Sequence, residues 1–272
     1  MRSLLLFPAR LWLALLFATP LAIVCAYSFL TRGAYGGITP PWTLENYRRL
    51  FDPLYAAILL RSILMAAAAT AICLVLAFPL AWFIARARRH RALYLHLVVL
   101  PFWTSFLVRT YAWVFLLRDT GLVNTALDAL GLIDKPLPLL YNNGAVLLGL
   151  VYGYLPFMVL PLYATLERLD PALLEAAADL GARPLATLFR VIVPLSQPGI
   201  RAGSALVFIP CVGAYLTPDL LGGGKTVMIG NLVQNQFTTA RDWPFGSAVS
   251  LVLMMVVTLL VVVFLRREEE RL

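Results

Sequence analysis

The one motif in this chain that suggests catalysis is a run of glycines followed by lysine and threonine, GGGKT at residues 222–226. Phosphate-binding loops end in this way, but they also need a glycine five residues before the last glycine of the run. Asp219 stands at that position, so the spacing excludes a phosphate-binding loop and favours a flexible turn. Metalloprotease and serine-hydrolase motifs are missing from the sequence as well. We therefore expect no catalytic residue, metal site or cofactor in this chain.

A pair of carboxylates is the second feature that could do chemistry. Glu175 and Asp179 lie four residues apart in the run EAAADLG, residues 175–181, so that on a helix they share one edge. The alanines between them leave room for another protein backbone, and Gly181 can end the helix in the left-handed conformation. This pattern predicts a docking surface for a partner protein.

The composition indicates what kind of protein must position these residues. Of the 272 residues, 61% are hydrophobic and only 13% are charged, and the mean hydropathy is +0.84. Globular proteins carry about 25% charged residues. Because a water-facing surface cannot be built from so few polar side chains, the composition excludes a soluble fold and predicts a protein that crosses the membrane several times.

Six stretches are long and apolar enough to cross a bilayer core about 30 Å thick, which takes about 20 residues of helix. The first is too long for the core of a signal peptide, and we expect it to be a permanent span. The fifth is the shortest, and a re-entrant segment is its alternative. Together they are expected to form a single membrane domain, residues 1–272, with spans at residues 11–30, 62–85, 92–117, 141–166, 200–220 and 243–265.

The distribution of positive charge predicts the orientation of the chain. With the N-terminus inside, 13 of the 22 basic residues fall in cytoplasmic segments and 7 in outside loops. The compact run RARRHR, residues 86–91, holds the loop between the second and third spans on the cytoplasmic side. We therefore expect both termini in the cytoplasm. The net charge of +8 is explained in this way, so no nucleic-acid partner is expected.

The connection between the fourth and fifth spans, residues 167–199, is long and patterned as two short helices. Asp170 is a good N-cap with Pro171 at the first helical position. Pro184 opens the second helix and Pro194 ends it. An amphipathic hairpin lying on lipid headgroups is the alternative. The acidic pair opposes that alternative, because the cytoplasmic leaflet is itself negative.

At this loop the chain resembles the permeases of ATP-binding-cassette (ABC) importers. Those permeases carry a motif of the form E-A-A-x3-G-x9-I-x-L-P, which this sequence matches with valine in place of isoleucine and of leucine. In the family, the loop is a coupling helix that seats in a groove of a separate ATPase. The resemblance implies an all-α membrane protein with the six transmembrane helices of the type I importer permease fold. It also implies that the ATPase-coupling residues are Glu175, Ala176, Ala177, Asp179, Gly181 and Pro194.

A narrower resemblance covers most of the chain. Four segments, residues 42–55, 100–113, 149–170 and 241–248, are similar to the first permease subunit of bacterial spermidine/putrescine importers. This implies a heterodimer with a second homologous permease, a homodimeric ATPase that binds ATP and Mg2+, and a periplasmic polyamine-binding protein. It also implies a bacterial inner-membrane location. Ala214 stands where many relatives carry an acidic residue, so cation selectivity would come from elsewhere or from the partner permease.

The candidate substrate-pathway residues are aromatic side chains and one carboxylate in the third and fifth spans. A cation is attracted to an aromatic ring face by about 0.5–2 kcal/mol. Trp103 and Tyr111 are eight residues apart, so one continuous helix would present both on one stripe, with interface packing as the alternative. Tyr215 and Asp219 lie toward the outer end of the fifth span. Because a charge at membrane depth is costly, we expect Arg109 to pair with Asp219.

The function predicted from these features is that of a transmembrane permease subunit of an ATP-driven polyamine importer, which forms half of the pathway and hydrolyses no ATP itself. Two alternatives stay open. One is a channel or secondary transporter for small organic cations that is driven by the membrane potential, which supplies about 2.3 kcal/mol per charge per 100 mV. The other is an ABC permease for a different small solute. The long docking loop favours an ABC permease over a channel, since a channel needs no motor.

Overall fold

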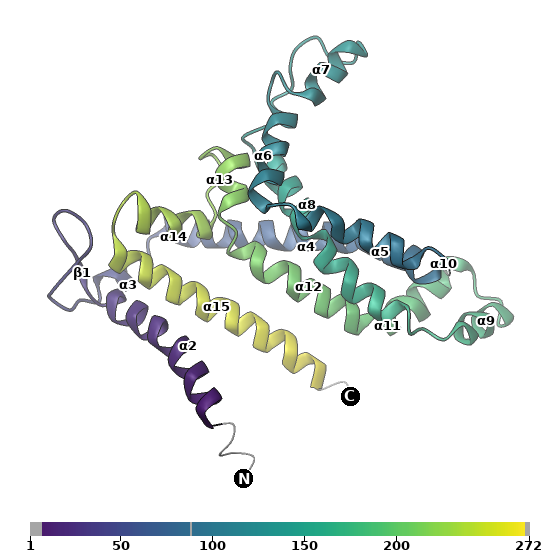
Figure 1. Cartoon of the computed structure of the whole chain (residues 1–272), viewed down its shortest axis with the longest axis horizontal. Helices are drawn as coiled ribbons and strands as arrows, with labels where there is room; N and C mark the ends of the chain where they lie inside the picture. Colours follow the sequence, from purple (N-terminus) through teal and green to yellow (C-terminus); the bar gives the residue numbers. More distant parts are fainter. Residues whose placement is uncertain (1–6, 88, 270–272) are drawn as a thin grey trace. The chain divides into compact units, whose positions relative to one another are not determined.

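The computed structural model describes residues 7–87 and 89–269, and most of them are helical (Figure 1). One short hairpin interrupts the helices, with β1 (Thr31–Arg32) antiparallel to β2 (Ile38–Thr39). The chain divides into two compact units. The prediction of an all-α membrane protein is confirmed. The prediction of a single domain stays a prediction.

The first unit combines the chain up to Leu60 with residues Ile229–Val263. Besides the hairpin, it contains α2 (Phe7–Ser28), α3 (Glu45–Arg49), α14 (Ile229–Thr238) and most of α15 (Trp243–Glu269). The helix α4 (Pro53–Arg86) begins in this unit and continues into the second.

The second unit consists mainly of Arg61–Met228. After α4, its elements in chain order are α5 (Arg91–Val99), the 3-10 turn η1 (Leu100–Trp103), α6 (Phe106–Leu117), α7 (Leu122–Ala129), α8 (Asn143–Leu166), α9 (Pro171–Asp179), α10 (Pro184–Thr187), the π-helical turn η2 (Leu188–Ile192), α11 (Val193–Leu195), α12 (Gln197–Val212) and α13 (Leu216–Gly222).

Four of the described helices, α2, α4, α8 and α15, are long and apolar enough to cross a membrane. Two further candidates are bent: Arg91–Trp103 meets Phe106–Ala129 at 87°, and Pro184–Leu195 meets Gln197–Val212 at 69°. If each bent pair is one span, the number of spans is six. The predicted first, second, fourth and sixth stretches coincide with the four straight candidates.

The third and fifth stretches are not the continuous helices that the sequence suggested. In the third, Pro101 has no amide hydrogen to donate, and the Thr104 hydroxyl donates to the Pro101 carbonyl at 2.7 Å. Thr104 and Ser105 are extended there, and the chain turns before α6 begins. In the fifth, α12 ends at Val212, and a short break precedes α13. That break begins at Gly213, a poor helix former.

The core of the second unit is the contact of α8 with α12, which Figure 1 shows side by side. Gly199 and Gly203, one turn apart on α12, face α8 directly. A Cβ atom at Gly199 would lie 2.8 Å from the Pro161 carbonyl oxygen, and one at Gly203 would lie 2.7 Å from the Met158 sulfur. The glycines therefore allow the two helices to touch at their backbones, as small residues do in membrane helix pairs.

The side of α4 that is turned inward is also lined by small residues. The positions follow helical spacing of three or four, and all are fully buried: Ala66, Ala69, Cys73, Ala77 and Ala81. The Cys73 thiol donates to the carbonyl oxygen of Val151 on α8 at 3.6 Å. This buried seam brings α4 against the helix that leads into the long loop.

Candidate functional site

The first arm of the long loop is α9, and local signals define both of its ends. At its start, the Asp170 carboxylate accepts a hydrogen bond from the Ala172 amide at 3.0 Å, and Pro171 occupies the first helical position. At its end, Gly181 has a φ of +75°, which only glycine adopts without strain. The Ala182 amide donates to the carbonyl of Ala177 at 3.0 Å, which closes the helix end. The helix therefore forms where the sequence placed it.

None of the α9 residues is buried within this chain. Glu175, Ala176 and Asp179 are exposed and Ala177 is half-buried. Leu180 is 88% exposed, which is unusual for a large apolar side chain. Neither of the two carboxylates forms an ion pair with any residue that the structure describes. α9 thus presents two carboxylates that have no ion-pair partner among the described residues, next to the exposed Leu180.

The second arm of the loop differs from the prediction, because its helix does not end at Pro194. It runs through the π-helical turn η2 into α11 and includes Pro194. A proline at this position cannot donate to the preceding turn, and its ring crowds the carbonyl there. The wider turn over Leu188–Ile192 accommodates the proline while the helix continues.

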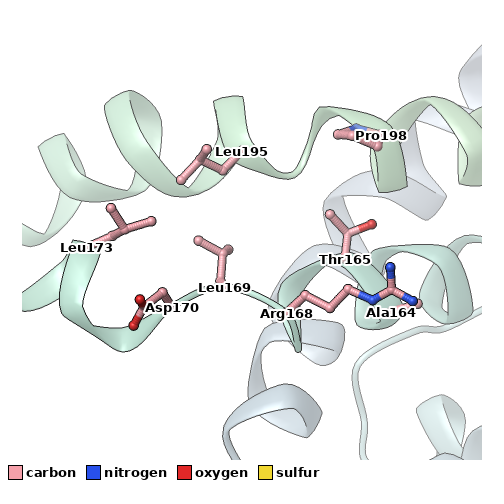
Figure 2. A pocket seen from close by; sticks show the side chains of 8 residues that line it. All are labelled: Ala164, Thr165, Arg168, Leu169, Asp170, Leu173, Leu195 and Pro198. Carbon is pink, nitrogen blue, oxygen red and sulfur yellow. The ribbon is translucent and has the colours of Figure 1, made fainter.

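The two arms are held around a cavity of about 490 Å3 at the base of the loop. Figure 2 shows Leu169 and Leu173 on one side and Leu195 on the other, with their side chains turned toward the space between them. The Asp170 carboxylate points away from this space, in keeping with its role as a cap. The arms thus face each other across an apolar space, and no residue of α9 is buried.

An ion pair lies next to this base. A guanidinium nitrogen of Arg91, at the start of α5, contacts a carboxylate oxygen of Glu167, the residue that follows α8. Both side chains are partly exposed, so the pair stabilises the fold only modestly. The ion pair links the end of α8 to the loop that carries the basic run 86–91. The first arm of the long loop begins at this end of α8.

The structure does not gather the predicted pathway residues into one site. Trp103 is 78% exposed and lies on η1, whereas Tyr111 lies on α6 beyond the bend and is 45% exposed. The predicted continuous stripe is therefore wrong, because the break at Thr104 separates them. Tyr215 is 47% exposed and Asp219 is exposed on α13. Since α13 packs against α6, the helices that carry Tyr111 and Asp219 are neighbours.

The predicted pair of Arg109 with Asp219 is not formed. The Arg109 guanidinium instead lies over two aromatic rings, 4.4 Å from the centre of Phe102 and 5.7 Å from that of Phe106. Its Nε and one Nη atom are buried without a hydrogen-bond partner. Cation–π attraction thus takes the place of the expected carboxylate.

The glycine run is a packed turn rather than the flexible one expected. Gly223 and Gly224 both have positive φ, and the turn lies against Tyr141. The Thr226 hydroxyl donates to the Asn143 side-chain oxygen at 2.7 Å, which ties the turn to the start of α8. Within the described residues, no group of three or more His, Cys, Asp and Glu side chains could hold a metal ion.

A cluster in the first unit was not anticipated from the sequence. Asp242 is buried and accepts a hydrogen bond from an Nη atom of Arg49 at 2.9 Å. The same guanidinium lies 4.0 Å from the centre of the Phe245 ring, which also contacts Tyr55. Asp242 in turn accepts from the Phe245 amide at 3.2 Å and caps α15. The only local signal was an aspartate just before Trp243 and a proline, which is typical of a helix start.

We expect Arg49→Ala to lower the thermal stability of the purified protein. The change leaves the buried Asp242 carboxylate without its cation, which costs about 2 kcal/mol. Arg48→Ala is the matched control, because Arg48 is exposed on the same short helix. Melting followed by size-exclusion chromatography in detergent checks the difference. Equal midpoints for the two variants would show that the ion pair contributes nothing.

The candidate spans and the exposed loop define a membrane subunit with a surface for a partner protein. The sequence profile of the binding-protein-dependent transport system inner membrane component family matches residues 11–269, and the chain belongs to this family. It is thus a multi-pass inner-membrane permease and not the catalytic subunit of its transporter. Membership implies three kinds of partner, namely a periplasmic binding protein, an ATPase and a second permease.

Two curated relatives and one solved structure illustrate the similarity. The spermidine/putrescine transport system permease protein PotB of Escherichia coli strain K12 is 47% identical over 243 residues, which are 89% of this chain and 88% of PotB. The inner membrane ABC transporter permease protein YdcU of the same strain is 38% identical over 92% of this chain and 84% of YdcU. A bacterial ABC transporter involved in the import of the acidic polysaccharide alginate has the same fold, with a TM-score of 0.72 at 18% identity, over 98% of this chain and 94% of that chain.

Proposed function

We propose that this chain is one of two distinct permease subunits of an ATP-driven importer for spermidine and putrescine. The identity of 47% with PotB, spread over 89% of the chain, carries this proposal. The PotB of Haemophilus influenzae supports it, with 46% identity over the same share of the chain. The substrates are flexible chains of protonated amines, which suits a pathway of weak contacts better than one tight site.

The proposed assembly contains four kinds of subunit. This permease pairs with a second, homologous permease to enclose the pathway, and a homodimer of ATPase subunits binds ATP and Mg2+. A periplasmic polyamine-binding protein delivers the substrate on the opposite side. Both termini and the long loop face the cytoplasm in this arrangement, in keeping with the excess of basic residues there.

The proposed coupling step begins at α9. Its exposed carboxylates and small side chains seat in the ATPase, with Glu175, Ala176, Ala177 and Asp179 as contacts and Gly181 and Pro194 shaping the arms. Closure of the ATPase dimer on ATP moves α9, and the motion passes through the base of the loop to α8 and α12. Because Gly199 and Gly203 lock these helices together, they move as one body against the second permease.

In the pathway, Trp103, Tyr111 and Tyr215 offer exposed ring faces to the passing amines, and Asp219 offers a carboxylate. Ala214 brings no charge of its own, so the second permease supplies the remaining acidic groups. Arg109 is held against phenylalanine rings and so leaves Asp219 free of a cation from α6.

Uptake of labelled spermidine by the reconstituted complex tests the proposal. We expect uptake to need the binding protein and ATP, and to stop when the ATPase carries a substitution that blocks hydrolysis. Uptake driven by a potassium diffusion potential without ATP would instead indicate a channel or secondary transporter. Stimulation of the ATPase by another solute, with none by spermidine or putrescine, would assign a different substrate.

Asp219→Asn is expected to lower spermidine uptake about fivefold, which corresponds to the loss of roughly 1 kcal/mol of charge attraction near water. The ATPase should still copurify with the variant, since Asp219 is not on the loop. Asp119→Asn is the control, because Asp119 is another exposed aspartate, close after the end of α6. A variant that lost ATPase binding but kept transport per assembled complex would remove Asp219 from the pathway.

A further inference from the structure

A second, larger cavity of about 790 Å3 lies between the C-terminal half of α4 and the long loop, where Leu174 and Ala178 of α9 line it together with residues of the second arm. Six larger apolar side chains line it on α4 and on the second arm. They are Val75, Phe78 and Trp82 on α4, and Leu185, Leu188 and Phe189 on the opposite side. All of them belong to the same compact unit, so the groove is a property of that unit alone.

This lining is open rather than closed over. Val75 is 70% exposed, Leu185 is 69% exposed and Phe189 is 66% exposed. Apolar side chains grouped in this way mark a place where another molecule covers them. In a chain that crosses the membrane, the most abundant apolar molecule beside such a groove is a lipid.

One end of the groove is positively charged. Arg86, the last residue of α4, also lines the groove and holds its guanidinium 4.4 Å from the centre of the Trp82 ring. The exposed side chains of Arg183 and Arg190 are next in sequence to two lining residues of the second arm, Pro184 and Phe189. These three arginines outnumber the two carboxylates on α9. The charge complements an anionic headgroup, while the aliphatic and aromatic wall complements an acyl chain.

We propose that this groove binds an anionic glycerophospholipid of the surrounding bilayer. Its acyl chain lies along Val75 and Phe78, and its phosphate meets Arg86 where α4 ends. The lipid then bridges α4 and the second arm, two parts of the unit that otherwise face each other across the cavity. This inference does not depend on which solute is transported. Its consequence is that anionic lipid stiffens the second arm of the loop, which leads into α12.

Native mass spectrometry of the complete complex, exchanged into phosphatidylglycerol or phosphatidylcholine, tests the proposal. We expect retained phosphatidylglycerol to fall at least fivefold in Arg86→Glu, with phosphatidylcholine unchanged. Val75→Trp fills the apolar end from an exposed position and should lower retention of both lipids. Arg86→Ala is a milder substitute if charge reversal impairs assembly, and it should give a smaller loss in the same direction.

Two matched controls lie elsewhere on the same unit. Arg118 is also exposed and placed 5.4 Å from a ring, that of Phe115, but it does not line the groove. Val108 is 62% exposed on α6. Arg118→Glu and Val108→Trp should therefore retain phosphatidylglycerol as the unchanged protein does.

Three results would overturn the proposal. The first is unchanged phosphatidylglycerol retention in Val75→Trp. The second is equal retention of the two lipids by the unchanged protein, because the arginines would then play no part. The third is loss of crosslinking between a photoreactive phosphatidylglycerol and the permease pair once the ATPase joins. That result would assign the groove to a segment of the ATPase.

Discussion

Reversal of both carboxylates on α9, in a variant with Glu175→Lys and Asp179→Lys, is expected to abolish ATP-driven uptake and to release the ATPase from the permease. Both side chains are exposed and form no ion pair with the part of the chain that the structure describes. A docked ATPase would bury them against its own cations, and breaking such a pair costs about 3–5 kcal/mol. Binding should therefore weaken more than a hundredfold. Copurification from membranes and permease-stimulated ATP hydrolysis measure the two losses.

Asp128→Lys serves as the control for this double variant, with Asp128 exposed on α7, away from the loop. It should assemble and transport normally. Gly181→Arg gives an independent check, because a side chain at a φ of +75° strains the end of α9 without meeting any neighbouring atom. If the double variant kept the ATPase and transported spermidine at the normal rate, α9 would not be the docking element.

The second large effect is expected for Gly199→Val. Its Cβ atom would lie 2.8 Å from the Pro161 carbonyl oxygen and 2.5 Å from the Thr165 hydroxyl. The carbonyl belongs to the backbone and cannot turn away, so α12 must move off α8. Overpacking of this kind costs about 1–3 kcal/mol and sometimes more. We expect little folded protein in membranes and a clearly lower melting temperature for what remains.

Gly213→Ala is the matched change on the same stretch of chain. A Cβ atom at Gly213 meets no atom within 4 Å, and the residue has a negative φ, so this variant should fold like the unchanged protein. Fluorescence-detected size-exclusion chromatography after heating compares the two glycine variants directly. Similar melting temperatures for both would mean that the backbone contact of α8 with α12 adds no stability.

Local chemistry made the loop predictable. The helix α9 has an aspartate cap, a proline at the first helical position and a glycine at its end. Each of these acts within one or two turns, so the sequence around residues 170–181 is enough to predict the helix. The long apolar helices were predictable for a similar reason, since length and the absence of charge suffice to indicate them. The family motif then gave these local features a role.

Bends and pairings were harder to predict. Apolar stretches look continuous in the sequence, and hydropathy gives no sign of the break at Thr104 that separates Trp103 from Tyr111. The predicted ion pair of Arg109 with Asp219 rested on the assumption that opposite charges at similar membrane depth form a contact. In the structure the guanidinium instead contacts the rings of Phe102 and Phe106, which lie on the same stretch of chain.

The Arg49–Asp242 contact was missed for another reason. Its two residues are separated by 193 positions, and a single sequence carries no sign of such a distant partner. Each residue alone has an ordinary interpretation, the arginine as an interface anchor and the aspartate as a helix cap. Only the folded unit shows that the Arg49 guanidinium meets both the Asp242 carboxylate and the ring of Phe245.

The glycine-lined contact of α8 with α12 has a consequence for how force travels. At Gly199 and Gly203 the neighbouring groups include the backbone carbonyls of Pro161 and Met158, which cannot change rotamer, so this part of the contact resists small local adjustments. A displacement of α9 is therefore expected to pass through α8 and α12 with little deformation of their contact. It then reaches α13, which also packs on α8. Gating at the far end of the pore is then expected to be abrupt rather than graded.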